Sequence, residues 1–553
     1  MPNMSGADGR TAAQFLPRMF SQLPSAAVHS WNLGDLFESV VDVVPDREAV
    51  VTETVRLSYA DLDQRANRVA HALASRGVMP GDHVGLLLRN GHEYLEAMLG
   101  AFKLRAVPIN LNTRYTTDEL AYLLSRATPA ALITELDLVD RAHAAIADLG
   151  LSIATITQGT EYELALAQAP DHRPIVARSG DDRYLLYTGG TTGLPKGVMW
   201  RHEDLLFAAL GGGNSGGEPV EHPSEVATNA LTCRIRCLPA SPFTHGTAQW
   251  MALSTLLGGG TVVVDTSISF DAAHLWSLAE AEGATLLAIV GDAFARPLSD
   301  ALLAEPDRWQ LDELLVVLSG GAVLSPGVRR ELLDQLPWAV VVDGYGTSET
   351  GGQGQMPLWA GQEAGTLPRF HVDEFTAVLD DAGRPAPPGS GLVGRLARRG
   401  RMPLGYHGDP EGTAETFTKL QGERWAVPGD LARVEADGSV TLLGRGSSSI
   451  NTGGEKVFPE EVEIVLKGHP QVFDAVVVGI PDDRFGERVA AVVQCRSGQV
   501  LDRGDLDRYC REHLASFKLP RHVVLVDELR RRPSGKPDLV WARSQLLDAS
   551  ERD

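Results

Sequence analysis

The sequence predicts an α/β protein. We expect a large N-terminal domain of parallel sheets with helices on both faces and a small β-rich subdomain, then a small mobile α+β C-terminal domain. Three observations indicate this: strand and helix patterns alternate first, glycine, proline and short strands dominate from about residue 376, and a Ser/Gly-rich run begins at Arg445. Alternation of this kind is typical of parallel sheets covered by helices. The expected boundaries are 1–445, divided into a core at 30–375 and a β-rich part at 376–445, and 446–553.

The N-terminal part has clear helical and strand periodicity. Residues 59–76 form an amphipathic helix pattern that ends before Gly77. A second helix is expected at HEYLEAMLGAFKL, and short buried strands are expected at HVGLLLRN and AVPINLN. Further strands are predicted at TVVVD, ATLLAIV, ELLVVLSGG and AVVVDGYG.

The last hundred residues have their own α+β pattern. A short helix is predicted over 459–467, because Pro459 suits the first turn of a helix. Strands are expected at DAVVVGI, RVAAVVQC and RHVVLVD, and a second helix at LDRGDLDRYCREHLA. The preceding run GRGSSSINTGG is typical of a flexible linker or a turn-rich hinge.

Composition excludes several function classes. The chain has 553 residues, and 50 basic against 72 acidic side chains give a net charge of −22. A field of this sign repels nucleic acid and anionic lipid, so we expect neither as a bulk partner. The four cysteines show no zinc-ligand spacing and are expected to be reduced thiols. The N-terminus lacks a signal-peptide pattern, and no apolar run reaches about 18 residues. We therefore expect a cytoplasmic protein without a transmembrane segment.

The segment YTGGTTGLPK, from Tyr187 to Lys196, is the strongest local signal. It follows the strand pattern RYLLY and contains three glycines, three threonines and a lysine. Glycines allow close backbone approach and let successive N–H groups point at one anion, so the loop favours phosphate binding. It is not the Walker spacing, because no Ser or Thr follows the lysine. The alternative is a glycine-rich surface turn.

A second loop, DGYGTSETGG, follows the strand pattern WAVVVDG. Loops at the carboxyl ends of parallel strands build the ligand site of an open α/β sheet. Tyr345 offers a flat face for a base, and Glu349 is a hard oxygen ligand suited to magnesium. Alone, the loop could equally be an acidic turn on the surface.

Seven motifs occur in one order over about residues 30–545: YTGGTTGLPKG, SGGAVLS, GYGTSE, the aspartate of PGD, GR, GGEKVFPEEVE and PSGK. The series resembles the adenylate-forming superfamily of acyl-CoA synthetases, adenylation domains and luciferases. The stretches YLLYTGGTTGLPKGVMWRHED and GRGSSSINTGGEKVFPEEVE are most similar to actinobacterial fatty-acid and steroid-side-chain CoA ligases. The resemblance implies a ligase of lipid metabolism that joins a hydrophobic carboxylic acid to ATP, releases pyrophosphate and passes the acyl group to CoA.

The resemblance also implies roles for individual residues. The β- and γ-phosphates of ATP would be held by Thr188, Gly190, Thr191, Thr192 and Lys196. The adenine and α-phosphate would contact Gly320, Gly321, Ala322, Tyr345, Gly346 and Thr347. Asp430 would accept hydrogen bonds from the ribose with Arg445 nearby, and Thr192 and Glu349 would hold Mg²⁺. Each polar residue has an alternative role as a turn cap or a surface charge.

Lys536 lies in a Pro-Ser-Gly-Lys turn and would bridge the substrate carboxylate and the α-phosphate, where negative charge grows in the transition state. The alternative is an exposed lysine beside Arg530, Arg531 and Arg532. His245 would stand beside the acyl pocket as a gate, although a lone histidine is also compatible with a core role. In the family's second conformation, Gly453, Gly454 and Lys456 would let the pantetheine of CoA reach the adenylate.

The acyl pocket is expected to involve 236–250, 290–295 and 344–352, where Arg234 and Arg236 would bind a polar group of the acid or face solvent. The chain departs from the common family pattern at Gly189, at Leu392 and at Ser447–Ser448, where many relatives have Lys-Asp, so the hinge falls on Ser448. Three alternatives remain: an acceptor other than CoA, an unusual oxyacid such as nitrite, and a catalytically inactive nucleotide-binding protein. A homodimer is compatible with the resemblance.

Overall fold

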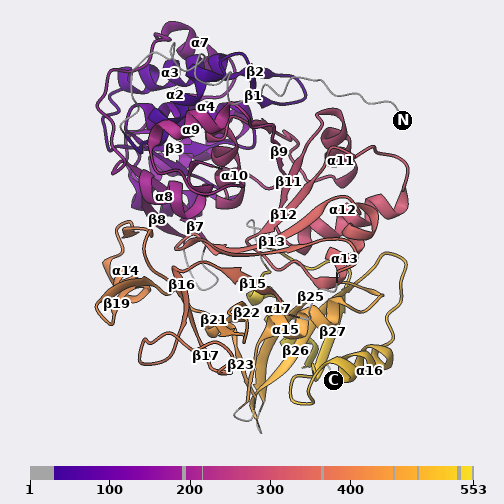
Figure 1. Cartoon of the computed structure of the whole chain (residues 1–553). Helices are drawn as coiled ribbons and strands as arrows, with labels where there is room; N and C mark the ends of the chain where they lie inside the picture. Colours follow the sequence, from indigo (N-terminus) through magenta and orange to yellow (C-terminus); the bar gives the residue numbers. More distant parts are fainter. Residues whose placement is uncertain are drawn as a thin grey trace, which may run out of the picture.

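The structure, a computed structural model, describes residues 30–189, 195–214, 216–362, 367–452, 455–482, 485–531 and 537–550. The described strands form three sheets of 15, seven and five strands. Figure 1 shows the helix-rich N-terminal part at the upper left and the C-terminal part, in yellow, at the lower right.

The seven-stranded sheet is built mainly by the first 200 residues. Its order is β18 (Gly405–Tyr406), β8 (Lys196–Arg201), β7 (Arg183–Thr188), β4 (Val107–Asn110), β3 (His83–Leu87), β5 (Ala131–Thr134) and β6 (Ala154–Thr157). From β7 to β6 the neighbouring strands are parallel. Their carboxyl ends therefore share one edge, where β7 ends at Thr188.

Helices cover both faces of this sheet, as predicted. They are α2 (Leu33–Val43), α3 (Tyr59–Ser75), α4 (His92–Lys103), α5 (Thr117–Ala127), α6 (Val139–Asp148), α7 (Thr160–Gln168) and α8 (His202–Ala209). Successive residues of β3 enter different cores: Leu86 packs in the cluster that includes α3 and α4, and Leu87 in the cluster that includes α5 and α6. The start of α3 is fixed by a capping box between Ser58 and Asp61.

A second run of parallel strands forms one half of the 15-stranded sheet. In order they are β2 (Arg56–Ser58), β1 (Glu48–Val51), β10 (Thr261–Val263), β9 (Arg236–Pro239), β11 (Leu286–Ile289), β12 (Val316–Gly320) and β13 (Val340–Thr347), with β2 antiparallel and the rest parallel. The helices here are α9 (Pro223–Ala230), α10 (Gly246–Leu257), α11 (Ala272–Ala281), α12 (Asp292–Ala304) and α13 (Pro326–Gln335). In Figure 1, α11, α12 and α13 lie together on the right of these strands.

The β-rich subdomain extends the same sheet with antiparallel strands. They follow β13 in the order β14 (Gly351–Leu358), β15 (Arg369–Val372), β22 (Val440–Arg445), β21 (Asp430–Val434), β17 (Val393–Arg398), β20 (Glu423–Ala426) and β19 (Phe417–Leu420), and β16 (Thr376–Leu379) pairs with β17. The helix α14 (Pro410–Thr416) precedes β19. The register of β21 and β22 places Asp430 opposite Arg445.

The C-terminal domain has the expected helices and strands. Its sheet has the order β24 (Glu455–Val457), β23 (Ile450–Thr452), β26 (Gly486–Cys495) and β25 (Val472–Asp482), and β27 (His522–Val526) pairs with β26. The helices are α15 (Pro459–Lys467), α16 (Arg503–His513) and α17 (Leu539–Ser550). Between β22 and β23, residues Gly446–Ser448 form one 3₁₀ turn, and the hinge at Ser448 stays a prediction.

The four cysteines are free. Across the described ranges, no helix combines the length and the apolar character needed to span a bilayer.

Candidate active site

The buried side chain of Asn110, at the carboxyl end of β4, joins two predicted site segments. Its amide nitrogen donates to the carbonyls of Tyr187 (2.8 Å) and Thr244 (2.7 Å), and its oxygen accepts from Tyr187 N (2.7 Å). These bonds hold Thr188, at the end of β7, close to His245, which occupies the N-cap position of α10. Sequence reasoning missed Asn110, because a single asparagine after a strand has no distinctive pattern.

The glycine loop after β12 lies between α10, the end of β11 and β13. Gly321 has a φ of +87°, and a Cβ there would lie 3.3 Å from Thr247 Oγ1 and 3.9 Å from Val290 Cγ1. A Cβ on Gly320 would lie 3.5 Å from the carbonyl oxygen of Gly344. Side chains at these positions would fill the space, so the glycines leave backbone surface at the sheet edge, where a flat base can approach.

Tyr345, Asp430 and Arg445, three predicted nucleotide-site residues, are in direct contact. Tyr345 Oη donates to Asp430 Oδ2 at 2.7 Å, and Arg445 Nε lies 3.3 Å from Asp430 Oδ1. Burial raises the pKa of Tyr345 well above its usual value, and the Asp430 carboxylate raises it further. Both oxygens of Asp430 have protein partners, so a ribose hydroxyl would share them.

The turn after β13 is fixed by its own hydroxyl groups. Thr347 Oγ1 lies 3.1 Å from Thr350 Oγ1 and accepts a hydrogen bond from Glu349 N at 3.2 Å. Trp200 Nε1, from β8, donates to the Ser348 carbonyl at 3.0 Å. The loop with Thr347 and Glu349 is therefore anchored to the strand that begins at Lys196.

Tyr406 connects the lysine of the phosphate loop to Glu349, and sequence reasoning did not select it. Its hydroxyl donates to Glu349 Oε1 at 2.9 Å, and Lys196 Nζ lies 4.8 Å from the centre of its ring. Lys196 Nζ also pairs with Asp409 Oδ2 at 3.0 Å. Burial, and then the negative charge of Glu349, raise the pKa of Tyr406. Its only sequence signal is a Gly-Tyr pair before a glycine- and proline-rich turn.

Some predicted residues lie elsewhere. Lys456 is exposed on β24. Gly190, Thr191, Thr192, Gly453, Gly454 and Lys536 lie outside the described residues. Arg236 begins β9, at the opposite edge of the sheet, and pairs with Glu48 (2.9 Å) and Glu282 (3.1 Å). Arg236 is therefore held by two glutamates and does not line the candidate site.

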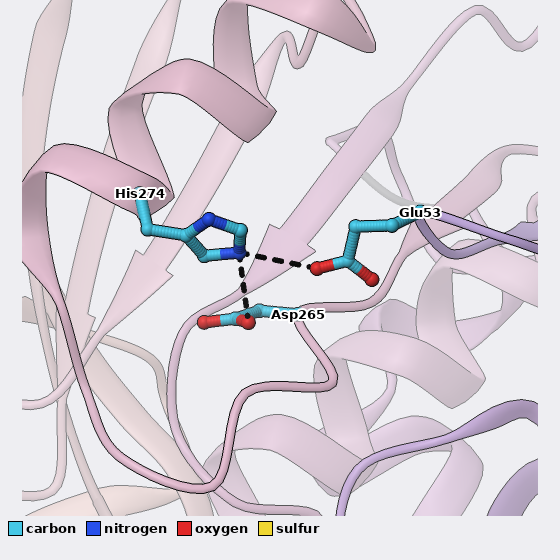
Figure 2. Close-up of side chains that lie close together, drawn as sticks. All are labelled: Glu53, Asp265 and His274. Atoms are coloured by element: carbon cyan, nitrogen blue, oxygen red, sulfur yellow. Dashed lines mark hydrogen bonds and ion pairs between the residues drawn. The ribbon is translucent and has the colours of Figure 1, made fainter.

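Figure 2 shows a separate polar cluster at the carboxyl ends of β1 and β10. His274 Nε2, from α11, lies 3.1 Å from Glu53 Oε1 and 3.5 Å from Asp265 Oδ1. Glu53 also accepts from Thr266 Oγ1 (2.9 Å), and Asp265 from Ser267 N (2.9 Å). The imidazole thus has two carboxylate partners, and the contacts attach α11 to the strand ends.

Comparisons with known proteins show the family of the chain. The family model described as AMP-binding enzyme matches residues 37–407, and the model described as AMP-binding enzyme C-terminal domain matches residues 461–536. The chain belongs to the AMP-binding enzyme family.

Curated relatives and solved structures match over nearly the whole chain. A 3-oxocholest-4-en-26-oate–CoA ligase of Rhodococcus rhodochrous is 44% identical over 533 residues, covering 93% of this chain and 96% of that one. A medium/long-chain-fatty-acid–CoA/3-oxocholest-4-en-26-oate–CoA ligase of Mycobacterium tuberculosis is 44% identical over 529 residues, with the same coverages of 93% and 96%. The ATP-bound crystal structure of MatB from Rhodopseudomonas palustris superposes with a TM-score of 0.78 at 27% identity, covering 95% of this chain and 99% of MatB.

These comparisons confirm the expected family and fold class. They also confirm an AMP-forming acid–thiol ligase of the acyl-CoA synthetase type, which adenylates a carboxylic acid with ATP and transfers the acyl group to CoA. Neither the individual residue roles nor the domain boundary at 445 is tested by them, so both stay predictions.

Proposed function

We propose that this enzyme activates medium- to long-chain fatty acids and steroid side-chain acids. The main support for this proposal is the similarity, over nearly the full length, to ligases named for these acids. The pocket segments support an apolar acid, because their charged residues are engaged elsewhere. Arg236 pairs with two glutamates at the far edge, and Asp292 accepts from Ser325 N at 2.7 Å and faces Lys467 at 3.6 Å.

The first step joins the acid to AMP. A carboxylate oxygen attacks the α-phosphorus of ATP, and the bond to the bridging oxygen breaks, so pyrophosphate leaves with the electron pair. In our proposal the glycine loop and Tyr345 hold adenine, Asp430 holds ribose, and Thr347 donates to the α-phosphate. Lys536 would neutralise charge that appears in the transition state.

The residues at Glu349 fit Mg²⁺. One carboxylate oxygen of Glu349 is oriented by the Tyr406 hydroxyl, and a carboxylate is the hard ligand that Mg²⁺ prefers beside phosphates. When bound there with Thr192, Mg²⁺ would offset phosphate charge. Lys196 would exchange its contact with Asp409 for the β- and γ-phosphates.

The second step forms the thioester. The CoA thiolate attacks the acyl carbonyl, the bond to the phosphate oxygen breaks, AMP leaves, and the thiol proton goes to solvent. Gly453, Gly454 and Lys456 would guide pantetheine, and His245 would gate the acyl pocket. The cytoplasmic location and the homodimer stay predictions.

A panel of acids tests the substrate class. Octanoate, palmitate, a 3-oxo steroid side-chain acid, benzoate and nitrite are each incubated with ATP and Mg²⁺, with and without CoA. We expect pyrophosphate and acyl-CoA from the first three. Activity on benzoate alone would overturn the proposed class, nitrite-dependent pyrophosphate would favour the oxyacid alternative, and adenylate without thioester would favour another acceptor.

A further inference from the structure

The two domains meet through charges of opposite sign. Arg496, directly after β26, places Nη1 2.9 Å from Asp300 Oδ1 on α12 and Nη2 3.3 Å from Glu331 Oε1 on α13. Lys467, the last residue of α15, places Nζ 3.6 Å from Asp292 Oδ2, at the first residue of α12. At each of these pairs the C-terminal domain provides the cation and the N-terminal domain the anion.

The Lys467 contact is buried. The side chains of Lys467 and Asp292 are 7% and 5% exposed. Lys467 Nζ also lies 3.3 Å from Asp474 Oδ1, on β25, and Asp474 pairs with Arg531. Burial would lower the pKa of Lys467, but the carboxylates of Asp474, Asp292 and Glu463 together raise it. Removing one partner of such a pair leaves an uncompensated buried charge.

Asp292 connects these buried ion pairs to the glycine loop after β12, which is called the nucleotide loop below. Its Oδ1 accepts from Ser325 N at 2.7 Å, while its Oδ2 faces Lys467. Ser325 follows the glycine loop that begins at Gly320. A continuous series of contacts therefore joins the nucleotide loop to Arg531 through Asp292, Lys467 and Asp474.

The orientation of the C-terminal domain keeps the β23–β24 hairpin away from the loop after β12. Arg531, at the end of this series of contacts, forms an isolated antiparallel bridge with Pro537. The β23–β24 hairpin carries Lys456. In Figure 1 the label of β23 lies at the bottom of the molecule, far from the ends of β12 and β13.

We propose that Asp292, Lys467, Asp474 and Arg531, assisted by Arg496 with Asp300 and Glu331, form an interdomain clamp that holds the adenylate-forming orientation. They are positioning residues: they fix the C-terminal domain against α12 and α13, and they must separate before Lys456, on the β23–β24 hairpin, can reach the loop after β12. This inference rests on the proposed roles of Lys536 and Lys456.

The clamp is tested by measuring the two half-reactions separately. Asp292→Asn removes the charge but keeps an oxygen that can accept from Ser325 N. We expect pyrophosphate release to fall about 10-fold or more, on the scale of a broken buried pair. Thioester formation from synthetic palmitoyl-adenylate and CoA should stay within about 2-fold of the wild type, because that step does not need the clamp.

The partly exposed ion pairs of Arg496 with Asp300 and Glu331 provide a second variant, and an ion pair outside the clamp provides a matched control. Asp300→Asn should slow pyrophosphate release about 2- to 5-fold, as expected for a partly exposed pair, and the difference should shrink at high salt. Asp507→Asn breaks an exposed pair with Arg511 inside α16 (2.6 Å) and should change neither half-reaction. Equal slowing of both half-reactions by Asp292→Asn, or slowing of neither, would overturn the clamp.

Hydrogen exchange separates failure of the clamp from failure of the proposed function. Peptides covering 467–474 should exchange faster in Asp292→Asn than in the wild type or Asp507→Asn, whether or not an acid is activated. If the wild type releases no pyrophosphate with any acid, the proposed function is wrong. If the exchange is also unchanged, the clamp is wrong as well.

Discussion

The hydrogen bond from Tyr406 to Glu349 gives a specific prediction about magnesium. Tyr406→Phe removes the donor at 2.9 Å from Glu349 Oε1 and keeps the ring that packs against Phe417 and faces Lys196. A hydrogen bond to a charged group contributes about 1.5–3 kcal/mol. If that energy orients the carboxylate toward Mg²⁺, the Mg²⁺ concentration for half-maximal activity should rise about 10- to 100-fold.

The assay is pyrophosphate release at saturating ATP and palmitate over a range of Mg²⁺ concentrations. Tyr59→Phe is a matched control, because the buried Tyr59 hydroxyl donates to the carbonyls of Leu256 (2.9 Å) and Gly260 (2.7 Å), away from the site. It should leave the Mg²⁺ dependence unchanged. An unchanged Mg²⁺ dependence in Tyr406→Phe would refute the positioning role. An equal loss of activity at all Mg²⁺ concentrations would do the same.

Three further predictions concern Glu460 on α15, Gly346 on β13 and Lys536. Burial, and then the charge of Glu463, raise the pKa of Glu460 from 4.5 to about 7, so the folded state holds a proton that the unfolded state has lost. The free energy of unfolding of the wild type, compared with that of Glu460→Gln, should therefore fall by about 3 kcal/mol as the pH rises from 4.5 to 7. Denaturant unfolding of both proteins at pH 5 and pH 8 measures this difference, and the same difference at both pH values would contradict the prediction. Gly346→Ala should lower ATP binding and the melting temperature, because its Cβ would overlap the Gly351 carbonyl; normal ATP affinity by calorimetry would oppose the assigned loop geometry. Lys536→Ala should slow adenylation about 100-fold or more and spare thioester formation from a preformed adenylate, and rapid-quench assays of both steps would expose an error in its role.

Local sequence signals predicted individual elements well. The helix predicted over 459–467 is α15, Pro459–Lys467, because a proline suits its first turn and its acidic start and basic end match the helix dipole. The resemblance assigned Tyr345, Asp430 and Arg445 to one site, and the three residues are in contact; their roles in nucleotide binding stay predictions. Those residues belong to motifs whose order along the chain is distinctive.

Contacts that depend on distant pairing could not be predicted. Tyr406 reaches Glu349 only because β18 pairs with β8, which is about 200 residues earlier in the chain. Asp292 and Lys467 belong to different domains, and each is unremarkable in its local sequence. The β-rich part was expected as a subdomain, but its continuity with the large sheet depends on the pairing of β15 with β22.

The central claim is that one site forms an acyl-adenylate and then transfers it to CoA. A single-turnover experiment with enzyme in excess over ³²P-α-labelled ATP, palmitate and Mg²⁺, without CoA, tests it most directly. We predict that labelled palmitoyl-AMP accumulates on the enzyme with one equivalent of pyrophosphate, and that added CoA converts it to AMP and palmitoyl-CoA. Formation of labelled ADP, or an adenylate that CoA does not consume, would contradict the claim.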